Sequence, residues 1–168
     1  FQWAVMAFVF GLMVGADNAA HLGALRAVPD LATADLSTIM AVNVVAPVRL
    51  MGFCLAEAPS DAALRVVNVS SGAAHLAIPG LADYCASKAA LDHFSASLML
   101  EVRHRGVKVT TIAPGSVDTS FAGVPPAADT SWMLTAEDIA ATVIDLLEAR
   151  DGAHLSRLEM RPARPQKR

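Results

Sequence analysis

The sequence predicts an α/β fold, with a doubly wound sheet of parallel strands and helices on both faces. Short runs rich in β-branched residues alternate with long segments in which apolar residues recur at helical spacing. An order of strand, helix and strand is typical of parallel strands joined by right-handed crossovers. The 168 residues are 54% hydrophobic, which is enough for one core, so we expect a single domain over residues 1–168.

The first 16 residues carry no charge, and three interpretations compete. A membrane span needs about 20 apolar residues, and this run stops at Asp17 and Asn18. A signal peptide would carry a basic N-terminal region, which this run lacks. We favour a buried helix end followed by a buried strand at 12–16, in a sequence that starts inside a domain. A loop is expected from there to about Asp30.

A long helix is predicted over residues 35–58, because its apolar residues follow helical spacing. Thr33 or Asp35 is the expected cap, and Pro59 is expected to end the helix. Pro47 is expected to kink it, since proline has no N–H to donate.

The rest of the chain alternates strands and helices in the same way. The turn Pro79-Gly80 precedes the second long helix, and Thr135, followed by acidic residues, opens the last one. In chain order we predict a strand at 64–70, a helix at 82–104, a strand at 107–113, a loop at 120–131, a helix from Thr135 to about Arg150, a strand at 155–160 and a basic tail at 161–168.

Composition excludes several classes of function. A net charge of −3 offers no broad basic surface, which argues against nucleic acid as a partner. Cys54 and Cys85 fall on predicted helices without metal-ligand spacing, and the five histidines form no zinc motif, so we expect no metal. The expected partner is a small molecule, and reduced cysteines favour a cytoplasmic location.

The strongest chemical signal is the pair Tyr84 and Lys88. Residues four apart share one face of a helix, so the ammonium is expected to lower the pKa of the phenol and make it an acid/base at neutral pH. Such a pair is common on protein surfaces and is weak by itself. Support comes from Ser71, at the end of the predicted strand 64–70, where ligands of parallel sheets bind. A hydroxyl there can hydrogen-bond a substrate oxygen on which charge changes.

At these residues the sequence resembles the short-chain dehydrogenase/reductase family. The resemblance rests on Ser71, Tyr84 and Lys88, on Asn43 in the first long helix, and on the segment Pro114 to Thr119. It implies a Rossmann-like fold that here lacks the first βαβ units, and a catalytic set in which Tyr84 is the acid/base. By the same resemblance Lys88 lowers the pKa of Tyr84 and holds the nicotinamide ribose, Ser71 polarises the substrate carbonyl, and Asn43 anchors a water in a proton relay.

The resemblance also implies a dinucleotide cofactor, NADP(H) or NAD(H). NADP(H) is slightly preferred, because the closing segment Leu158 to Pro162 is similar to that of some NADP-preferring reductases. The residues implied to bind the cofactor, besides Tyr84 and Lys88, are Asn18, Ala19, Pro114, Gly115, Val117 and Thr119. Each has an alternative role: Asn43 can bond a backbone carbonyl, Ser71 and Thr119 can cap, and Pro114-Gly115 can form an ordinary turn.

The sequence departs from the family at its beginning. We find no Gly-rich turn for the pyrophosphate; the run Gly11 to Asp17 imitates its first two glycines, and we interpret this as chance. We therefore expect an N-terminally truncated member, and two hypotheses remain. Either the chain is an NAD(P)(H)-dependent enzyme that interconverts alcohols with ketones or aldehydes, or it is a non-catalytic remnant or interaction module.

Partners and substrate are less well defined. We expect a homodimer or homotetramer through the outward faces of helices 35–58 and 82–104, and no membrane partner. The loops 73–83 and 120–134 are expected to line an apolar substrate pocket with His75, Leu76, Ile78, Phe121, Trp132 and Met133.

Overall fold

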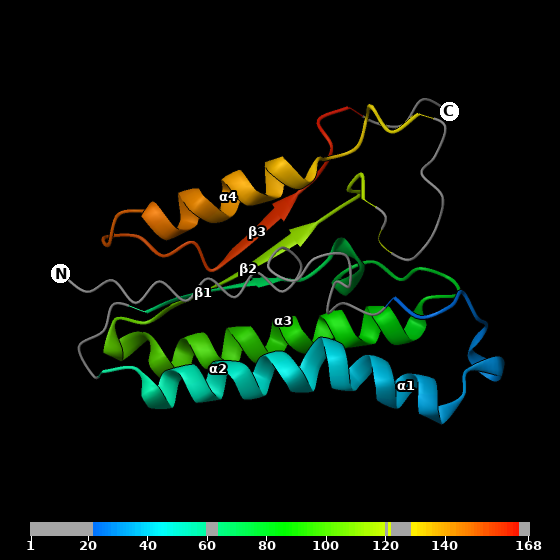
Figure 1. Cartoon of the computed structure of the whole chain (residues 1–168), viewed down its shortest axis with the longest axis horizontal. Coiled ribbons are helices and arrows are strands. Elements are labelled where there is room, and N and C mark those ends of the chain that lie inside the picture. Colours follow the sequence, from blue (N-terminus) through cyan, green and yellow to red (C-terminus); the bar gives the residue numbers. More distant parts are fainter. Residues whose placement is uncertain (1–21, 60–63, 120, 122–128, 165–168) are drawn as a thin grey trace.

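The structure, a computed structural model, describes residues 22–59, 64–119, 121 and 129–164. Its sheet has three parallel strands in the order β1 (Arg65–Val69), β2 (Lys108–Pro114) and β3 (Arg157–Met160). Helix α4 (Ala136–Glu148) covers one face. Helices α1 (Thr33–Met40), α2 (Ala46–Glu57) and α3 (Ala82–Val102) lie on the other (Figure 1). The predicted α/β architecture is confirmed, whereas the expected strand at 12–16 lies outside the described residues.

Two apolar clusters fill the space between the sheet and its helices. The first joins β1 and β2 to α2 and α3, and includes Met51, Val66, Leu91 and Val109. The second, on the α4 side, contains Val67, Ile112, Val143 and Leu146. Strands buried on both faces are typical of parallel sheets, and both 64–70 and 107–113 are rich in the β-branched residues that suit such strands.

The first long helix is less regular than predicted. A π-helical turn, Ala41–Val45, separates α1 from α2. Pro47 lies in the first turn of α2, where it cannot donate to the carbonyl of Asn43 four residues earlier, so the irregularity precedes the proline. The predicted caps Thr33 and Asp35 are wrong: Ala32 precedes the helix and makes no side-chain cap.

The segment Thr33–Glu57 is also long and apolar enough to cross a membrane by length and composition. Core helices pass the same test, and this segment contributes Ile39, Asn43, Met51 and Cys54 to the buried interior. These residues pack the segment against the rest of the fold, while only 33% of its most apolar 18-residue window is buried.

The other predicted boundaries are close to those observed. Helix α3 continues into a 3-10 turn, Arg103–Arg105, and Gly106 follows with φ of 76°, a left-handed conformation that favours glycine. Thr135 caps α4 through a capping box with Asp138, as predicted. The expected loop before Asp30 contains a short 3-10 helix, Val28–Asp30, and most of the loop 120–131 lies outside the described residues.

Candidate active site

Tyr84 and Lys88 share the buried face of α3, as their spacing predicts. Both side chains are almost fully buried, and the Lys88 Nζ lies 5.8 Å from the centre of the Tyr84 ring. The ammonium donates a hydrogen bond of 3.1 Å to the carbonyl of Val69, at the end of β1. Helix α3 therefore holds the pair at the carboxyl end of β1.

The expected effect on the pKa of Tyr84 is wrong in direction. Burial raises the pKa of this phenol above its ordinary value of 10.0, and a hydrogen bond with the Ser71 side chain opposes that rise. The Lys88 ammonium beside the ring does not reverse this direction, because burial has the larger effect. Burial also lowers the pKa of Lys88 to about 8, against the opposing charge of Asp92.

Ser71 lies where the sequence places it, two residues after β1 ends at Val69. It caps a short 3-10 helix, Gly72–Ala74, by accepting a hydrogen bond of 3.1 Å from the amide of Ala73. The same side chain lies close enough to the Tyr84 phenol to oppose the rise of its pKa. Its two interpretations, as a cap and as a partner of the tyrosine, are therefore compatible.

Asn43 is 2% exposed and lies in the π-helical turn between α1 and α2. Its side-chain amide donates a hydrogen bond of 2.9 Å to Ser87 Oγ, which in turn donates one of 2.8 Å to the carbonyl of Tyr84. Sequence reasoning missed Ser87. Its position three residues after Tyr84, on the same face of a helix, is the signal that could have found it.

The segment after β2 approaches the Ser71 turn. A Cβ built on Gly72 would lie 3.5 Å from the Pro114 carbonyl oxygen, and Gly115 donates its amide to Met160 of β3 at 2.8 Å. The sequence implicates three segments: the turn at Ser71, the segment Pro114 to Thr119, and the pair Asn18 and Ala19. The first two thus meet at one edge of the sheet. The third, which contains Asn18 and Ala19, lies outside the described residues.

Val117 forms an isolated parallel bridge with Leu134. The two bonds of this bridge use the carbonyl of Ser116 and the amide of Asp118, so the amide and carbonyl of Val117 itself face away from Leu134. Thr119 is exposed, and its hydroxyl accepts a hydrogen bond of 3.4 Å from the amide of Phe121. The local cap that the sequence allowed at Thr119 is thus present.

The residues expected around the substrate do not all converge. Phe121 lies against Tyr84, with ring centres 6.2 Å apart, and so borders the site. His75 instead contacts Asp92 and Arg157, and Trp132 and Met133 line a separate cavity beside α4. Among the described residues no group of three or more His, Cys, Asp or Glu side chains could hold a metal ion.

The model of the short chain dehydrogenase family matches residues 11–127, more than half of the sequence. The chain belongs to the short chain dehydrogenase family. Retinol dehydrogenase 5 of Homo sapiens is one relative; it is 36% identical over 109 residues, which cover 64% of this chain and 32% of that protein. The chain spans only about a third of the length of the first curated relatives it matches.

Solved structures agree with this family assignment. A 4-hydroxyisoleucine dehydrogenase complexed with NADH and succinate matches with a TM-score of 0.75 at 21% identity, over 85% of this chain and 64% of the other. At this identity the likeness shows the fold. An angucycline C-6 ketoreductase with bound NADP matches with a TM-score of 0.73 at 25% identity, over 85% and 59% of the two chains.

Proposed function

We propose that this short chain dehydrogenase carries the catalytic part of an NAD(P)(H)-dependent oxidoreductase that interconverts an alcohol with a ketone or aldehyde. The observation that carries the proposal is the buried Tyr84, which hydrogen-bonds Ser71 and has the Lys88 ammonium beside its ring. An acid, a hydroxyl donor and a cation at one strand end are what proton transfer to a carbonyl oxygen needs.

In this proposal Tyr84 gives its phenolic proton to the carbonyl oxygen during reduction and takes it back during oxidation. Ser71 donates a hydrogen bond to the same oxygen, where negative charge develops. Lys88, with a pKa of about 8, is still charged at pH 7 and stabilises the phenolate left after proton transfer. Asn43 anchors a water that returns a proton to the relay.

Several described residues fit the nicotinamide half of a dinucleotide. The backbone groups of Val117 face away from its bridge partner, as bonds to a carboxamide would require, and Lys88 makes one hydrogen bond although an ammonium has three donors. We propose that Pro114, Gly115, Val117, Thr119 and Lys88 hold this half, together with Asn18 and Ala19. When bound, the dinucleotide supplies or accepts the hydride. The segment Leu158 to Pro162 slightly favours NADP(H).

The first test is cofactor binding by the purified chain. NADPH, NADH and reduced nicotinamide mononucleotide are titrated by fluorescence, with Lys88→Met as the matched variant. We expect saturable binding of all three, weakened in K88M; the mononucleotide isolates the half that the described residues fit. No binding at millimolar concentration to a folded sample would instead support a non-catalytic remnant.

We also propose that copies of the chain associate through α2 and α3. The exposed side chains Phe53 of α2 and Leu100 of α3, with Val45 just before α2, leave apolar surface there, which supports an interface. A sedimentation profile of a monomer at micromolar concentration would contradict it. The cytoplasmic location stays a prediction.

A further inference from the structure

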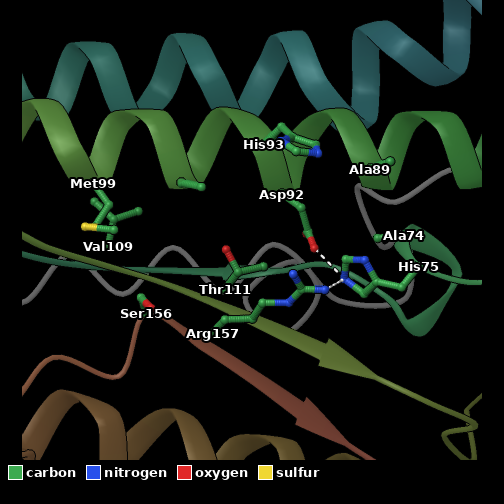
Figure 2. A pocket seen from close by; sticks show the side chains of 11 residues that line it. Ala74, His75, Ala89, Asp92, His93, Met99, Val109, Thr111, Ser156 and Arg157 are labelled. Atoms are coloured by element: carbon green, nitrogen blue, oxygen red, sulfur yellow. Dashed lines mark hydrogen bonds and ion pairs between the residues drawn. The ribbon is translucent and has the colours of Figure 1, made fainter.

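A cavity of about 220 Å³ lies between α3 and the strands β2 and β3, and two of its polar lining residues, Asp92 and Arg157, contact a third, His75 (Figure 2). His75 Nε2 lies 2.8 Å from Asp92 Oδ2 of α3, and the same nitrogen contacts the guanidinium of Arg157 at the start of β3. Three separate parts of the chain therefore meet at the His75 imidazole.

His75 is the last residue of the turn that begins with Ser71. Ser71 caps the 3-10 helix Gly72–Ala74 at its beginning, and His75 ends it by donating its amide to the Gly72 carbonyl at 3.1 Å. The amide of Ala74 donates to the Ser71 carbonyl at 3.0 Å. These backbone hydrogen bonds connect the two ends of a short turn. A displacement of His75 is therefore expected to displace Ser71.

The burial of Asp92 explains why its contact with His75 is stabilising. Its side chain is 8% exposed, and neither carboxylate oxygen makes a well-directed hydrogen bond to another described residue. The 2.8 Å contact with the imidazole is therefore the closest polar contact of this carboxylate with another described residue. A carboxylate buried in this way is costly unless polar groups lie beside it, so separating His75 from Asp92 is unfavourable.

The pair joins the two elements whose alignment the proposed chemistry requires. Asp92 lies two turns after Tyr84 on α3, and His75 belongs to the turn that presents Ser71 to Tyr84. We propose that His75 and Asp92 are positioning residues that hold the Ser71 turn against α3, so that the Ser71 hydroxyl meets the Tyr84 phenol. The catalytic meaning of this alignment rests on the proposed function, but its test does not.

The test uses the fact that Tyr84 is the single tyrosine of the sequence. In protein labelled with ¹³C-tyrosine, the one Cζ resonance at pH 7 reports the hydrogen bond between Ser71 and Tyr84 without cofactor or substrate. We expect Ser71→Ala to shift this resonance, and His75→Gln and Asp92→Asn to shift it in the same direction by a comparable amount. In the S71A background, H75Q should add no further shift.

His93→Gln is the matched control. His93 is next to Asp92 and lines the same cavity, but it is exposed and makes no ion pair with another described residue, so its resonance should match the wild type. H75Q is the decisive variant, because D92N also removes a charge that acts on Lys88. A wild-type resonance in H75Q, or an equal shift in the S71A background, would overturn the proposal. Failure of the chain to bind a dinucleotide would leave this result intact.

Discussion

Helices α3 and α4 cover opposite faces of the same sheet, but they bury different kinds of side chain (Figure 1). Helix α4 buries three residues, all of them apolar: Ile139, Val143 and Leu146. Helix α3 buries nine, of which six carry polar groups: Asp83, Tyr84, Ser87, Lys88, Asp92 and Ser95. One helix is an amphipathic cover, and the other brings a row of polar groups into the interior.

This difference indicates that α3, rather than α4, accepts the energetic cost of buried polar groups for the sake of the proposed chemistry. A buried polar group is destabilising unless it is hydrogen-bonded, and most of the polar side chains on α3 have partners. Ser95 Oγ accepts a hydrogen bond of 2.8 Å from Asn68 of β1, and Ser87 does the same for Asn43. Apolar residues at these positions would need no hydrogen-bond partners. We therefore interpret α3 as the helix of the site and α4 as a scaffold.

The largest expected effect is that of Tyr84→Phe on α3. The variant keeps the ring and loses only the phenolic oxygen, so carbonyl reduction should fall by about 10²- to 10⁴-fold, the range for loss of a general acid. Stability should change by no more than about 1 kcal/mol, because one hydrogen bond with Ser71 is lost. The measurement is NADPH consumption with a panel of aryl and alkyl ketones, beside urea unfolding. Equal rates for Y84F and the wild type would remove Tyr84 from the proposed mechanism.

A variant on α4 is expected to lose stability and to keep its activity. Leu146→Ala removes a buried side chain from the cluster around Val67 and Ile112, and should lower the free energy of unfolding by about 2–5 kcal/mol. Because Leu146 lies on the far face of the sheet, activity per folded molecule should not change. A loss of activity in a fully folded sample would show that α4 is more than a scaffold.

The buried cation on α3 should make stability depend on pH. The pKa of Lys88 is lowered from 10.5 to about 8, so between these values the unfolded chain binds a proton that the folded chain does not. Stability therefore rises with pH through this window, by roughly 3 kcal/mol at most, as the cost of the buried charge is relieved. Lys88→Met should abolish the rise, which urea unfolding at a series of pH values measures.

The ionisation of Tyr84 should make stability depend on pH in the opposite direction to that of Lys88. The pKa of Tyr84 is raised above 10.0, so its contribution is fully present below pH 10 and is lost as the pH rises through the folded pKa. The wild type should pass through a maximum of stability at alkaline pH. K88M should show only the descending limb, and a K88M profile that still rises from about pH 8 would contradict the assignment to Lys88.

The features that sequence reasoning predicted well are those that depend on local patterns. The strands β1 and β2, the extent of α3 and the Thr135 cap follow from periodicity and from residue types at helix ends. The shared face of Tyr84 and Lys88 follows from a spacing of four. These properties are set within a few residues of chain, so no tertiary information is needed to obtain them.

The features that were missed depend on contacts between distant segments. The roles of Ser87 and Asp92 arise from Asn43 and His75, which other parts of the chain bring to α3. The pKa of Tyr84 was predicted in the wrong direction because burial outweighs the ordinary effect of a nearby cation, and burial is a tertiary property. The π-helical turn likewise reflects packing around Asn43 as well as the proline after it.

The smallest effect is expected at the start of α4, where Thr135 and Asp138 form a reciprocal cap. Thr135 Oγ1 accepts a hydrogen bond of 3.2 Å from the Asp138 amide, so Thr135→Ala should cost about 1 kcal/mol of unfolding free energy. Thr142→Ala on the same helix is the control, because its hydroxyl bonds the Asp138 carbonyl within the helix and alanine is a better helix former. T135A should lower the urea midpoint and T142A should leave it unchanged or raise it. Since neither residue contacts Tyr84 or Ser71, both variants should retain wild-type activity when folded, and a selective loss in T135A would tie the α4 cap to the site.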